Sequence, residues 1–355
     1  MAAPGRPRFR RRTPPPAVEQ AVGRAMRIDD AIRRFREQRA RRRGLVPTVI
    51  PYTGYGAPGW VRVLGRVLLV GTPGGAAKAE SVRGWRSFTS VAVDRQRVKV
   101  TIGDVVHHVL ADRGGVIDVR LEARLEPGWH RIRVETEGEA ENALPVEAPV
   151  FVVDPAAPFG IISDIDDTVM VTALPRPLLA AWNTFVLDEH ARAATPGMAV
   201  LYDRLHRAHP EAPVIYLSTG AWNVAPTLTR FLSRNLYPPG PLLLTDWGPT
   251  PDRIFRSGRQ HKIDQLERMA EEFPEMRWLL IGDDGQHDEE TYGGFAEDHP
   301  ENVAAVCIRR LSPGEAVLAG GRSREGGSRT PPGVHWISSP DGKGLADELA
   351  NAGFL

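Results

Sequence analysis

Hydrophobic and polar side chains alternate along residues 46–155 with a period of two. Valine, isoleucine or leucine occupies the alternate positions of four runs, except for Gly65 in the first, and the residues between them are mostly charged or polar. The runs are 61–69, 98–102, 117–121 and 132–134. Such alternation is typical of strands that bury one face and expose the other. The turn sequences Arg113-Gly114-Gly115 and Glu126-Pro127-Gly128 lie between runs. The pattern predicts a small antiparallel β-sandwich domain over residues 46–155.

The pattern changes at residue 156, where short apolar runs begin to alternate with helical segments. The apolar runs are 159–163, 214–217, 242–244, 277–281 and 303–308, and the helical segments are 198–209, 225–235 and 261–273. This alternation predicts an α/β domain over 156–355, built on a doubly wound parallel sheet. We expect 334–337 and 344–355 to return to this sheet after a flexible, glycine-rich loop at 320–332. Fewer than thirty residues separate Thr168 from Pro196, so any cap over the sheet should be small.

The N-terminal residues differ from both patterns. Residues 1–16 are rich in arginine and proline without apolar periodicity, which predicts a disordered basic tail. Residues 17–45 have a helical period, with one apolar side formed by Val18, Val22, Ala25, Ile32 and Phe35. We expect a capped amphipathic helix whose apolar side packs on the protein body, with insertion into a membrane interface as the less favoured alternative.

Composition and charge narrow the class of protein. A chain of 355 residues, 42% of them hydrophobic, can form two domains with substantial cores. Its single cysteine, Cys307, cannot form an internal disulfide, and no apolar run reaches the roughly 20 residues that span a bilayer. We therefore expect a cytoplasmic protein, at most peripheral to the membrane. Net charge is +1, yet residues 1–43 hold fourteen arginines against four carboxylates. That segment is either a solubilising tail or a contact for anionic lipid, and no nucleic-acid partner is expected.

Polar residues follow several of the apolar runs in the second half of the chain. Asp164 and Asp166 follow the first run, Ser218 the second and Asp283 the fourth, while Lys262 lies at the start of a helical segment. Ligands of doubly wound sheets bind beyond the carboxyl ends of the strands, where these side chains should meet. One carboxylate can attack a phosphoryl group while another transfers protons. Such an attack needs a hard cation with oxygen ligands and a nearby positive side chain.

Each of these features taken singly has an ordinary structural explanation. An aspartate pair often marks a loop or a helix cap, a lone serine or lysine is usually structural or solvated, and Gly282-Asp283-Asp284 is a common turn sequence. The segment 71–78 resembles a phosphate loop but lacks the required glycine before Lys78, so it is interpreted as a turn. The order of the aspartates, serine and lysine, each at the end of an element, favours the catalytic interpretation.

The series from Asp164 through Ser218 and Lys262 to Asp283 resembles the four ordered motifs of the haloacid dehalogenase (HAD) superfamily. Within it, the segments 163–169, 216–222 and 281–288 are similar to the actin-patch-associated phosphatidate phosphatase family. This resemblance covers about residues 60–340 and is strongest over 159–290. It implies a HAD-like fold and a phosphatase that uses Mg²⁺ and an aspartyl-phosphate.

The same resemblance implies a role for each residue. Asp164 would be the nucleophile and a metal ligand, and Asp166 would act as acid and base while its carbonyl oxygen binds the metal. Asp283 would be the acidic ligand from the far strand, with Asp284 and Asp288 either binding the metal or orienting its water. Ser218 would bind phosphoryl oxygens, and Lys262 would offset negative charge.

The substrate is less constrained than the reaction. A small cap and a basic N-terminus favour a phospholipid such as phosphatidate, with peripheral membrane contact through the Arg-rich segment. A soluble phosphoester is the first alternative, and a catalytically silent scaffold with a β-sandwich binding module is the second. A receiver domain is disfavoured, because its acidic pair precedes the acceptor aspartate and its lysine comes last.

Overall fold

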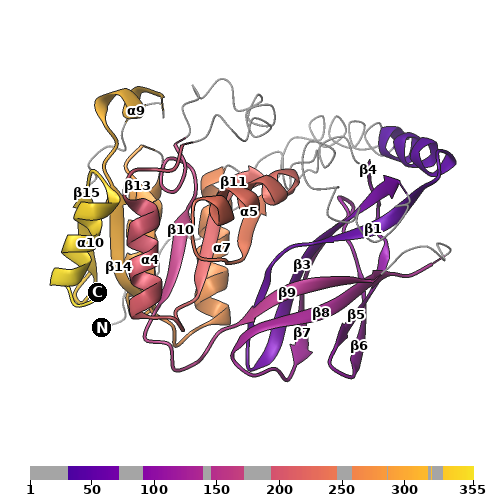
Figure 1. The fold of residues 1–355 in the computed structure, drawn as a ribbon, viewed down its shortest axis with the longest axis horizontal. Helices are drawn as coiled ribbons and strands as arrows, with labels where there is room; N and C mark the ends of the chain where they lie inside the picture. Colours follow the sequence, from indigo (N-terminus) through magenta and orange to yellow (C-terminus); the bar gives the residue numbers. More distant parts are fainter. Residues whose placement is uncertain are drawn as a thin grey trace, which may run out of the picture.

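The computed structural model describes residues 31–71, 91–138, 145–171, 193–245, 258–285, 287–318, 321 and 331–355. Its strands form two sheets, one of nine strands and one of six (Figure 1). The predictions made for residues 1–30, for the segment 72–78 and for a cap within 172–192 lie outside the described residues. Most of the loop predicted at 320–332 lies outside them too.

The nine-stranded sheet contains all four alternating runs. Its strands are β1 (Leu45–Pro51), β2 (Gly54–Ala57), β3 (Gly59–Gly71), β4 (Val91–Ala92), β5 (Arg97–Ile102), β6 (Val105–Leu110), β7 (Val116–Ala123), β8 (Gly128–Thr136) and β9 (Val146–Val152). Their order is β1-β3-β2-β9-β8-β5-β6, with β4 and β7 also paired to β3. Only the β2–β9 pair is parallel among the described pairs. Hydrogen bonds join all nine strands into one mixed sheet, so the sandwich of two sheets stays a prediction.

The six-stranded sheet has the parallel arrangement that the sequence predicts. Its order is β12-β11-β10-β13-β14-β15 and every described pair is parallel. The strands are β10 (Gly160–Asp164), β11 (Val214–Ala221), β12 (Leu242–Thr245), β13 (Trp278–Asp283), β14 (Val303–Arg309) and β15 (His335–Ser339). The α/β class is therefore confirmed.

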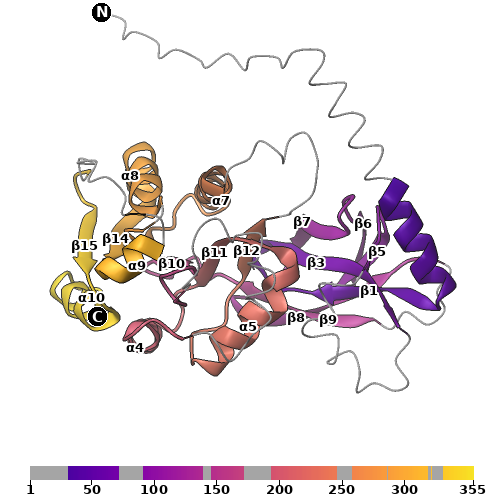
Figure 2. The ribbon, with the colours of Figure 1, turned by 90° about the horizontal axis from the view of Figure 1, so that it is seen from above.

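Helices cover both faces of the parallel sheet. They are α4 (Met198–Ala208), α5 (Ala225–Arg234), α7 (Gly258–Glu272), α8 (Asp288–Asp298), α9 (Pro313–Leu318) and α10 (Gly342–Asn351), with the short 3-10 helices η4 (Trp222–Val224) and η5 (Pro300–Asn302). Seen from above, α7 and α8 lie on one face, and α4, α5 and α10 lie on the other (Figure 2). Because helices cover both faces of the sheet, β13 and β14 are buried at every position.

The two sheets share one hydrophobic cluster. Tyr55 and Trp60 of the nine-stranded sheet pack against Phe273, which directly follows α7, with ring centroids 6.0 and 5.4 Å away. Beside them, the Glu272 carboxylate accepts hydrogen bonds from the Tyr55 hydroxyl and the Arg62 guanidinium. The nine-stranded sheet is thus attached to α7, the helix that carries Lys262.

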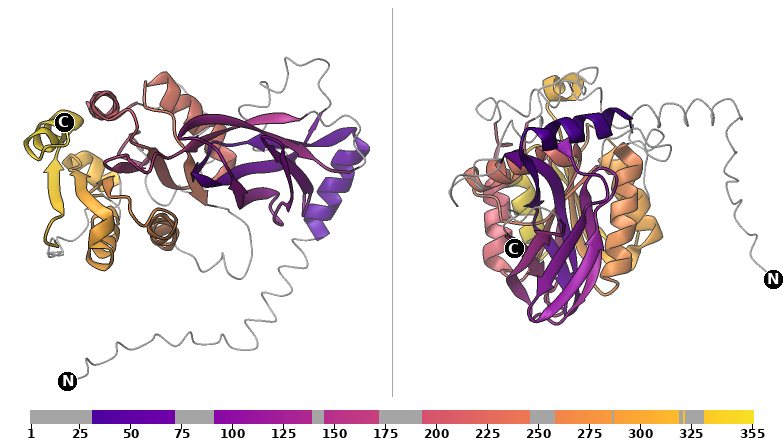
Figure 3. Two further views of the ribbon diagram at one scale, coloured as in Figure 1. Left: turned by 90° about the horizontal axis from the view of Figure 1, so that it is seen from below. Right: turned by 90° about the vertical axis from the view of Figure 1, so that its right-hand side faces the viewer.

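The N-terminal helix differs from its prediction. Residues 31–42 are helical, and Ala40 is buried, but Ile32 and Phe35 are 52% and 65% exposed. The expectation that these two residues pack on the protein body is therefore wrong. The helix lies across one end of the nine-stranded sheet (Figure 3), so only its last turn reaches the core. Within the described residues, every helix is too short or too polar to span a bilayer.

Candidate active site

Strand register brings the predicted polar residues to one edge of the parallel sheet. Asp164 ends β10 and pairs with Leu217 of β11, so Ser218 comes one position later on the neighbouring strand. On the other side Ser163 pairs with Ile281 of β13, which places Asp283 at the same edge. Parallel strands that stop at the same level present their next side chains to one crevice.

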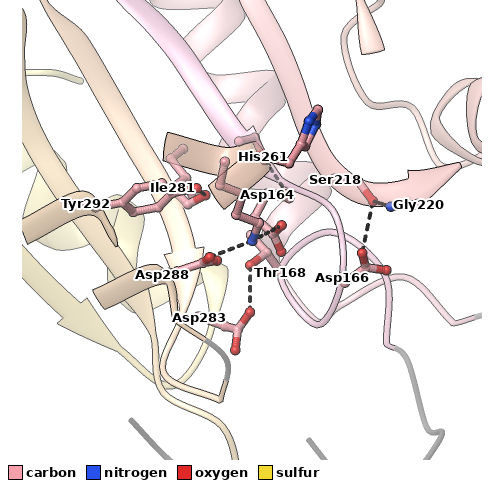
Figure 4. Close-up of polar contacts among 12 residues, drawn as sticks. Asp164, Asp166, Thr168, Ser218, Gly220, His261, Ile281, Asp283, Asp288 and Tyr292 are labelled. Atoms are coloured by element: carbon pink, nitrogen blue, oxygen red, sulfur yellow. Dashed lines mark hydrogen bonds and ion pairs between the residues drawn. The ribbon is translucent and has the colours of Figure 1, made fainter. Parts of the chain in front are cut away.

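A tight turn after β10 fixes the first aspartates. The amides of Val169 and Met170 both donate to the Ile165 carbonyl at 3.0 Å, which closes the turn. Asp167 within this turn has a positive φ of 58°, a conformation that aspartate tolerates better than most residues. The turn lets Asp164 and Asp166 project toward different parts of the site (Figure 4).

Lys262 lies between two carboxylates. Its Nζ is 2.6 Å from Asp164 Oδ1 and 2.5 Å from Asp288 Oδ1, and all three side chains are buried. Lys262 comes from α7 and Asp288 from the first residue of α8, so this contact joins two helices to the end of β10. Burial lowers the pKa of Lys262, but the two carboxylates raise it by more, so the ammonium stays charged.

Three carboxylates gather around this lysine. Asp164, Asp283 and Asp288 each offer an oxygen within 4.8 Å of the others. Asp283 Oδ1 accepts the Gly285 amide at 2.6 Å, and its Oδ2 accepts the Thr168 hydroxyl at 3.5 Å. Among the described residues, Asp164 Oδ2 and Asp288 Oδ2 are buried and have no hydrogen-bond donor.

A cation would balance the charges of this cluster when all three carboxylates are ionised, because they face a single ammonium. Without one, burial raises the pKa of both Asp164 and Asp283 above the usual range, with neighbouring carboxylates adding to the effect and Lys262 opposing it. A divalent ion would restore neutrality and supply a partner for the two bare oxygens. Because the cluster consists of carboxylates alone, it fits a hard cation that prefers oxygen ligands.

Ser218 and Asp166 form a second part of the site. The Ser218 hydroxyl donates to Asp166 Oδ2 at 3.0 Å and accepts the Gly220 amide at 3.0 Å (Figure 4). β11 bulges here, because the four steps from Leu217 to Ala221 lie opposite only two steps of β12, from Leu243 to Thr245. The bulge moves Ser218 out of the regular strand and toward Asp166.

The structure thus brings Asp164, Lys262 and Asp283 together, with Ser218 beside Asp166. Asp288 completes the carboxylate cluster, whereas the Asp284 carboxylate accepts the Leu311 amide at 2.8 Å and lies outside it. The metal contact expected from the Asp166 carbonyl oxygen stays a prediction.

Sequence reasoning missed Arg309. This buried residue ends β14, and its Nη1 donates to the Asp167 carbonyl at 2.7 Å while its Nη2 pairs with Glu315. Its own carbonyl accepts the Asp284 amide, so Arg309 connects the loop after β10 with the loop after β13. The available signal was a charged residue directly after the apolar run 303–308.

Comparisons with known proteins agree with this geometry. Residues 159–310 match a family model described as the catalytic domain of phosphatidate phosphatase APP1. Over 204 residues the chain is 27% identical to phosphatidate phosphatase APP1 of Saccharomyces cerevisiae. The matched segment makes up 57% of this chain and 34% of the yeast protein. The chain therefore spans about a third of the length of this relative.

Two further similarities are weaker. An uncharacterized protein of Schizosaccharomyces pombe is 27% identical over 158 residues, covering 42% of the chain and 24% of that protein. The solved structure of a carbohydrate acetylesterase from Xanthomonas citri has 11% identity and a TM-score of 0.30, over 78% of this chain and 73% of that one. A score this low supports no statement about the fold.

Proposed function

This chain belongs to the family of the phosphatidate phosphatase APP1 catalytic domain, and from that premise we propose that it hydrolyses phosphomonoesters through a phospho-aspartate on Asp164. The observation that carries the proposal is the contact of Lys262 with Asp164 and Asp288, next to Asp283. These groups supply the carboxylates that a cation needs and the ammonium that would face a phosphoryl group. We propose a HAD-like catalytic domain over 156–355, preceded by a β-sandwich domain over 46–155.

We propose Mg²⁺ as the cofactor. Asp164, Asp283 and Asp288 would hold it, and the Asp166 carbonyl oxygen would complete the set. When bound there, the ion would neutralise charge on the phosphoryl oxygens. Thr168 and the Gly285 amide already orient the Asp283 carboxylate for this task.

In the first half-reaction, an Asp164 carboxylate oxygen attacks the phosphorus atom. The new bond between oxygen and phosphorus forms as the ester bond breaks, and Asp166 gives its proton to the departing alcohol oxygen. Lys262 offsets the charge of nucleophile and phosphate, and Ser218 hydrogen-bonds a phosphoryl oxygen. The Ser218 hydroxyl points at Asp166 in the present structure, so it can orient this acid as well.

In the second half-reaction, Asp166 takes a proton from water. The water oxygen attacks the phosphorus atom, the bond to Asp164 breaks, and inorganic phosphate leaves. Asp166 is protonated again and ready for the next substrate, so no further reactant is needed. One carboxylic acid serves both halves because its protonation state alternates.

Phosphatidate is the substrate that we favour. The named relative carries this activity in its name, and the exposed arginine-rich helix 31–42 can attract anionic lipid. We propose a cytoplasmic protein that meets the lipid at a membrane surface; its one cysteine, Cys307, is buried and unpaired. A soluble phosphoester remains the alternative substrate.

Replacing Asp164 by asparagine tests the nucleophile. Asp164→Asn keeps the shape of the side chain but removes the attacking charge, so magnesium-dependent turnover of a phosphomonoester should fall by a factor on the order of 10⁴ or more. Labelled phosphate should no longer become covalently attached to the chain. Asp347→Asn, at an exposed carboxylate of α10, is the control and should behave as wild type. Substantial turnover by Asp164→Asn would exclude this nucleophile.

A substrate panel separates the two substrate classes. Phosphatidate in vesicles and a set of soluble phosphoesters are each assayed with magnesium and with a chelator. Release of phosphate from phosphatidate supports the lipid proposal, whereas turnover of soluble esters alone would replace it by the alternative. Absence of turnover on every ester would favour the scaffold interpretation.

A further inference from the structure

A tyrosine from the nine-stranded sheet lies against the segment that carries Ser218. Tyr52 sits between β1 and β2, and its ring stacks on Trp222 with centroids 4.9 Å apart and planes 10° from parallel. The Tyr52 hydroxyl also donates to the Trp222 carbonyl oxygen at 3.1 Å. Both side chains are buried. One residue thus fixes the ring and the backbone of Trp222 together.

Trp222 directly follows the bulge of β11 that presents Ser218. Besides the Ser218–Asp166 hydrogen bond, residues of the catalytic half of the chain contact this bulge on two sides. The Thr245 hydroxyl lies 2.9 and 3.1 Å from the carbonyl oxygens of Thr219 and Gly220. On the other side Gly258, at the start of α7, approaches Thr219 so closely that an added Cβ would lie 2.8 Å from its methyl group. At the far end of the bulge Ala221 pairs with Thr245 of β12, and Tyr52 contacts the next residue, Trp222.

We propose that Tyr52 is a positioning residue, through which the nine-stranded sheet holds the segment 218–222 and so keeps Ser218 against Asp166. The effect on catalysis rests on the proposed function, whereas the contact between Tyr52 and Trp222 is independent of it. Tyr52 lies outside the matched segment 159–310. The nine-stranded sheet therefore contributes to the catalytic edge, in addition to any binding role of its own.

A bulged strand is weakly restrained, which is the physical reason why Ser218 should depend on the contact of Tyr52 with Trp222. The residues 218–220 have no regular ladder partner on β12, so their position depends on contacts at both ends. A stacked aromatic pair and a buried hydrogen bond restrain Trp222 in direction and in distance. Loss of that restraint lets the Ser218 hydroxyl move relative to Asp166, and misplacement by about 1 Å can cost about 100-fold in rate.

Hydrogen–deuterium exchange of the full-length chain tests the contact directly. In Tyr52→Leu the amides of 218–222 should exchange about tenfold faster than in wild type. Tyr52→Phe keeps the aromatic stack and loses the hydroxyl, so we expect a smaller increase in the exchange rate of these amides. If Tyr52→Leu does not fold, Tyr52→Phe takes its place in the test. The matched control is Tyr55→Leu, since Tyr55 is buried in the same interface but bonds to Glu272. Tyr55→Leu should lower Tm and leave exchange at 218–222 unchanged.

Steady-state kinetics on the same variants test the catalytic consequence. Tyr52→Leu should lower kcat/KM between about 10-fold and 100-fold, mainly through kcat, because Ser218 and Asp166 act in the transition state. For Tyr55→Leu, kcat/KM should stay within about twofold of wild type per folded molecule.

Wild-type exchange at 218–222 in the Tyr52 variants would overturn the inference. Faster exchange with unchanged kcat/KM would overturn the catalytic part. A wild-type chain without phosphatase activity would refute the proposed function, while the exchange result would still decide the contact.

Discussion

The pKa values of two neighbouring basic residues on α7 shift in opposite directions, although burial lowers both. Lys262 touches Asp164 and Asp288, so its pKa is raised although burial opposes its charge. His261 is half-buried, and its ring faces the Leu243 carbonyl oxygen at 3.5 Å. Burial lowers the pKa of His261 to about 4, with Arg268 and Lys262 adding to the decrease and Asp264 opposing it. At neutral pH the helix therefore presents one charged and one neutral side chain.

The shift at His261 makes stability depend on pH. The unfolded chain binds a proton near the ordinary pKa of 6.5, whereas the folded chain binds it only near 4. Folding is therefore disfavoured progressively as pH falls from about 6.5 to about 4, by up to about 3 kcal/mol. Above pH 6.5 both states hold a neutral ring and the effect is absent.

Replacing His261 by glutamine should remove this contribution. We expect the free energy of unfolding of His261→Gln to fall less between pH 7.5 and pH 4.5 than that of wild type, by about 2 kcal/mol. Urea titrations at both pH values measure the difference. His206→Gln, on the exposed side of α4, is the control. An equal loss of stability in wild type and His261→Gln would contradict the assignment.

At the residue scale, the sequence predicts the side chains whose position follows from strand ends. Asp164, Ser218 and Asp283 were predictable because parallel strands align their carboxyl ends. The contacts of Arg309 with the Asp167 carbonyl and of Tyr52 with Trp222 were not, since they join segments 142 and 170 positions apart in the chain. Periodicity reports which side of its own element a residue occupies, and contains no information about such partners.

At the scale of elements, the join between β13 and α8 shows how closely the site is packed. Gly282 lies in β13, and a Cβ added there would lie 2.6 Å from Asp288 Oδ2 and 2.7 Å from the Tyr292 ring. Backbone and helix can approach this closely only because residue 282 has no side chain. The glycine therefore sets how near Asp288 comes to the carboxylate cluster.

Gly282→Ala should displace α8 and move Asp288 away from Lys262. We expect the chain to remain folded but to need at least about tenfold more Mg²⁺ for half-maximal thermal stabilisation. Thermal unfolding at increasing Mg²⁺ concentration gives this value.

The same substitution at Gly294 is the matched control. Gly294 is an exposed position of α8, and nothing lies within 4 Å of the added Cβ. Gly294→Ala should leave the Mg²⁺ dependence unchanged and raise stability by about 0.5–1 kcal/mol. A normal Mg²⁺ response in Gly282→Ala would show that Asp288 does not hold the ion.

Most elements with a clear hydrophobic pattern were predicted. β5, β7 and β8 alternate over much of their length, and the parallel strands are short apolar runs, so their hydrophobic pattern was sufficient. β3 was predicted too, but it buries Leu64 and Leu68 as well as the alternate positions, and β9 was missed although its burial alternates. β6 was missed because valines at 105 and 106 are exposed on an edge strand, where burial does not select the pattern. α8 was missed because Gly293 and Gly294 weaken its helical propensity, and packing on β13 and β14 compensates.

At the scale of the whole molecule, helix 31–42 and α9 lie on the same side of the molecule but toward opposite ends of its long axis (Figure 1). Helix 31–42 crosses one end of the nine-stranded sheet, and α9 follows the carboxyl end of β14 (Figures 1 and 3). The catalytic residues come from the carboxyl ends of the same parallel strands. A flat surface along this side of the molecule would face both helix 31–42 and the carboxyl ends of the parallel strands, an arrangement suited to a substrate held in a membrane (Figure 1).

The exposed residues of helix 31–42 combine charge with apolar surface. Ile32 and Phe35 are exposed, and so are the arginines at positions 34, 36, 39, 41, 42 and 43. Each basic residue near an anionic membrane contributes about 1 kcal/mol, and buried apolar side chains add to the binding. Because the two contributions add, removal of the apolar part should weaken binding measurably.

Vesicle binding by charged variants of this helix tests the membrane contact. Ile32→Glu with Phe35→Glu should lower binding to phosphatidylcholine vesicles containing phosphatidate by at least about tenfold, because the change removes apolar contact and adds repulsion. Binding to vesicles of phosphatidylcholine alone should be weak for every form.

Val106→Glu, at an exposed valine of the β5–β6 hairpin, is the control and should bind as wild type. Turnover of a soluble phosphoester should be the same in all forms, since the substitutions are outside the catalytic edge. If the helix variant binds and hydrolyses phosphatidate in vesicles as wild type does, the helix is not the membrane contact, and the enzyme proposal is unaffected.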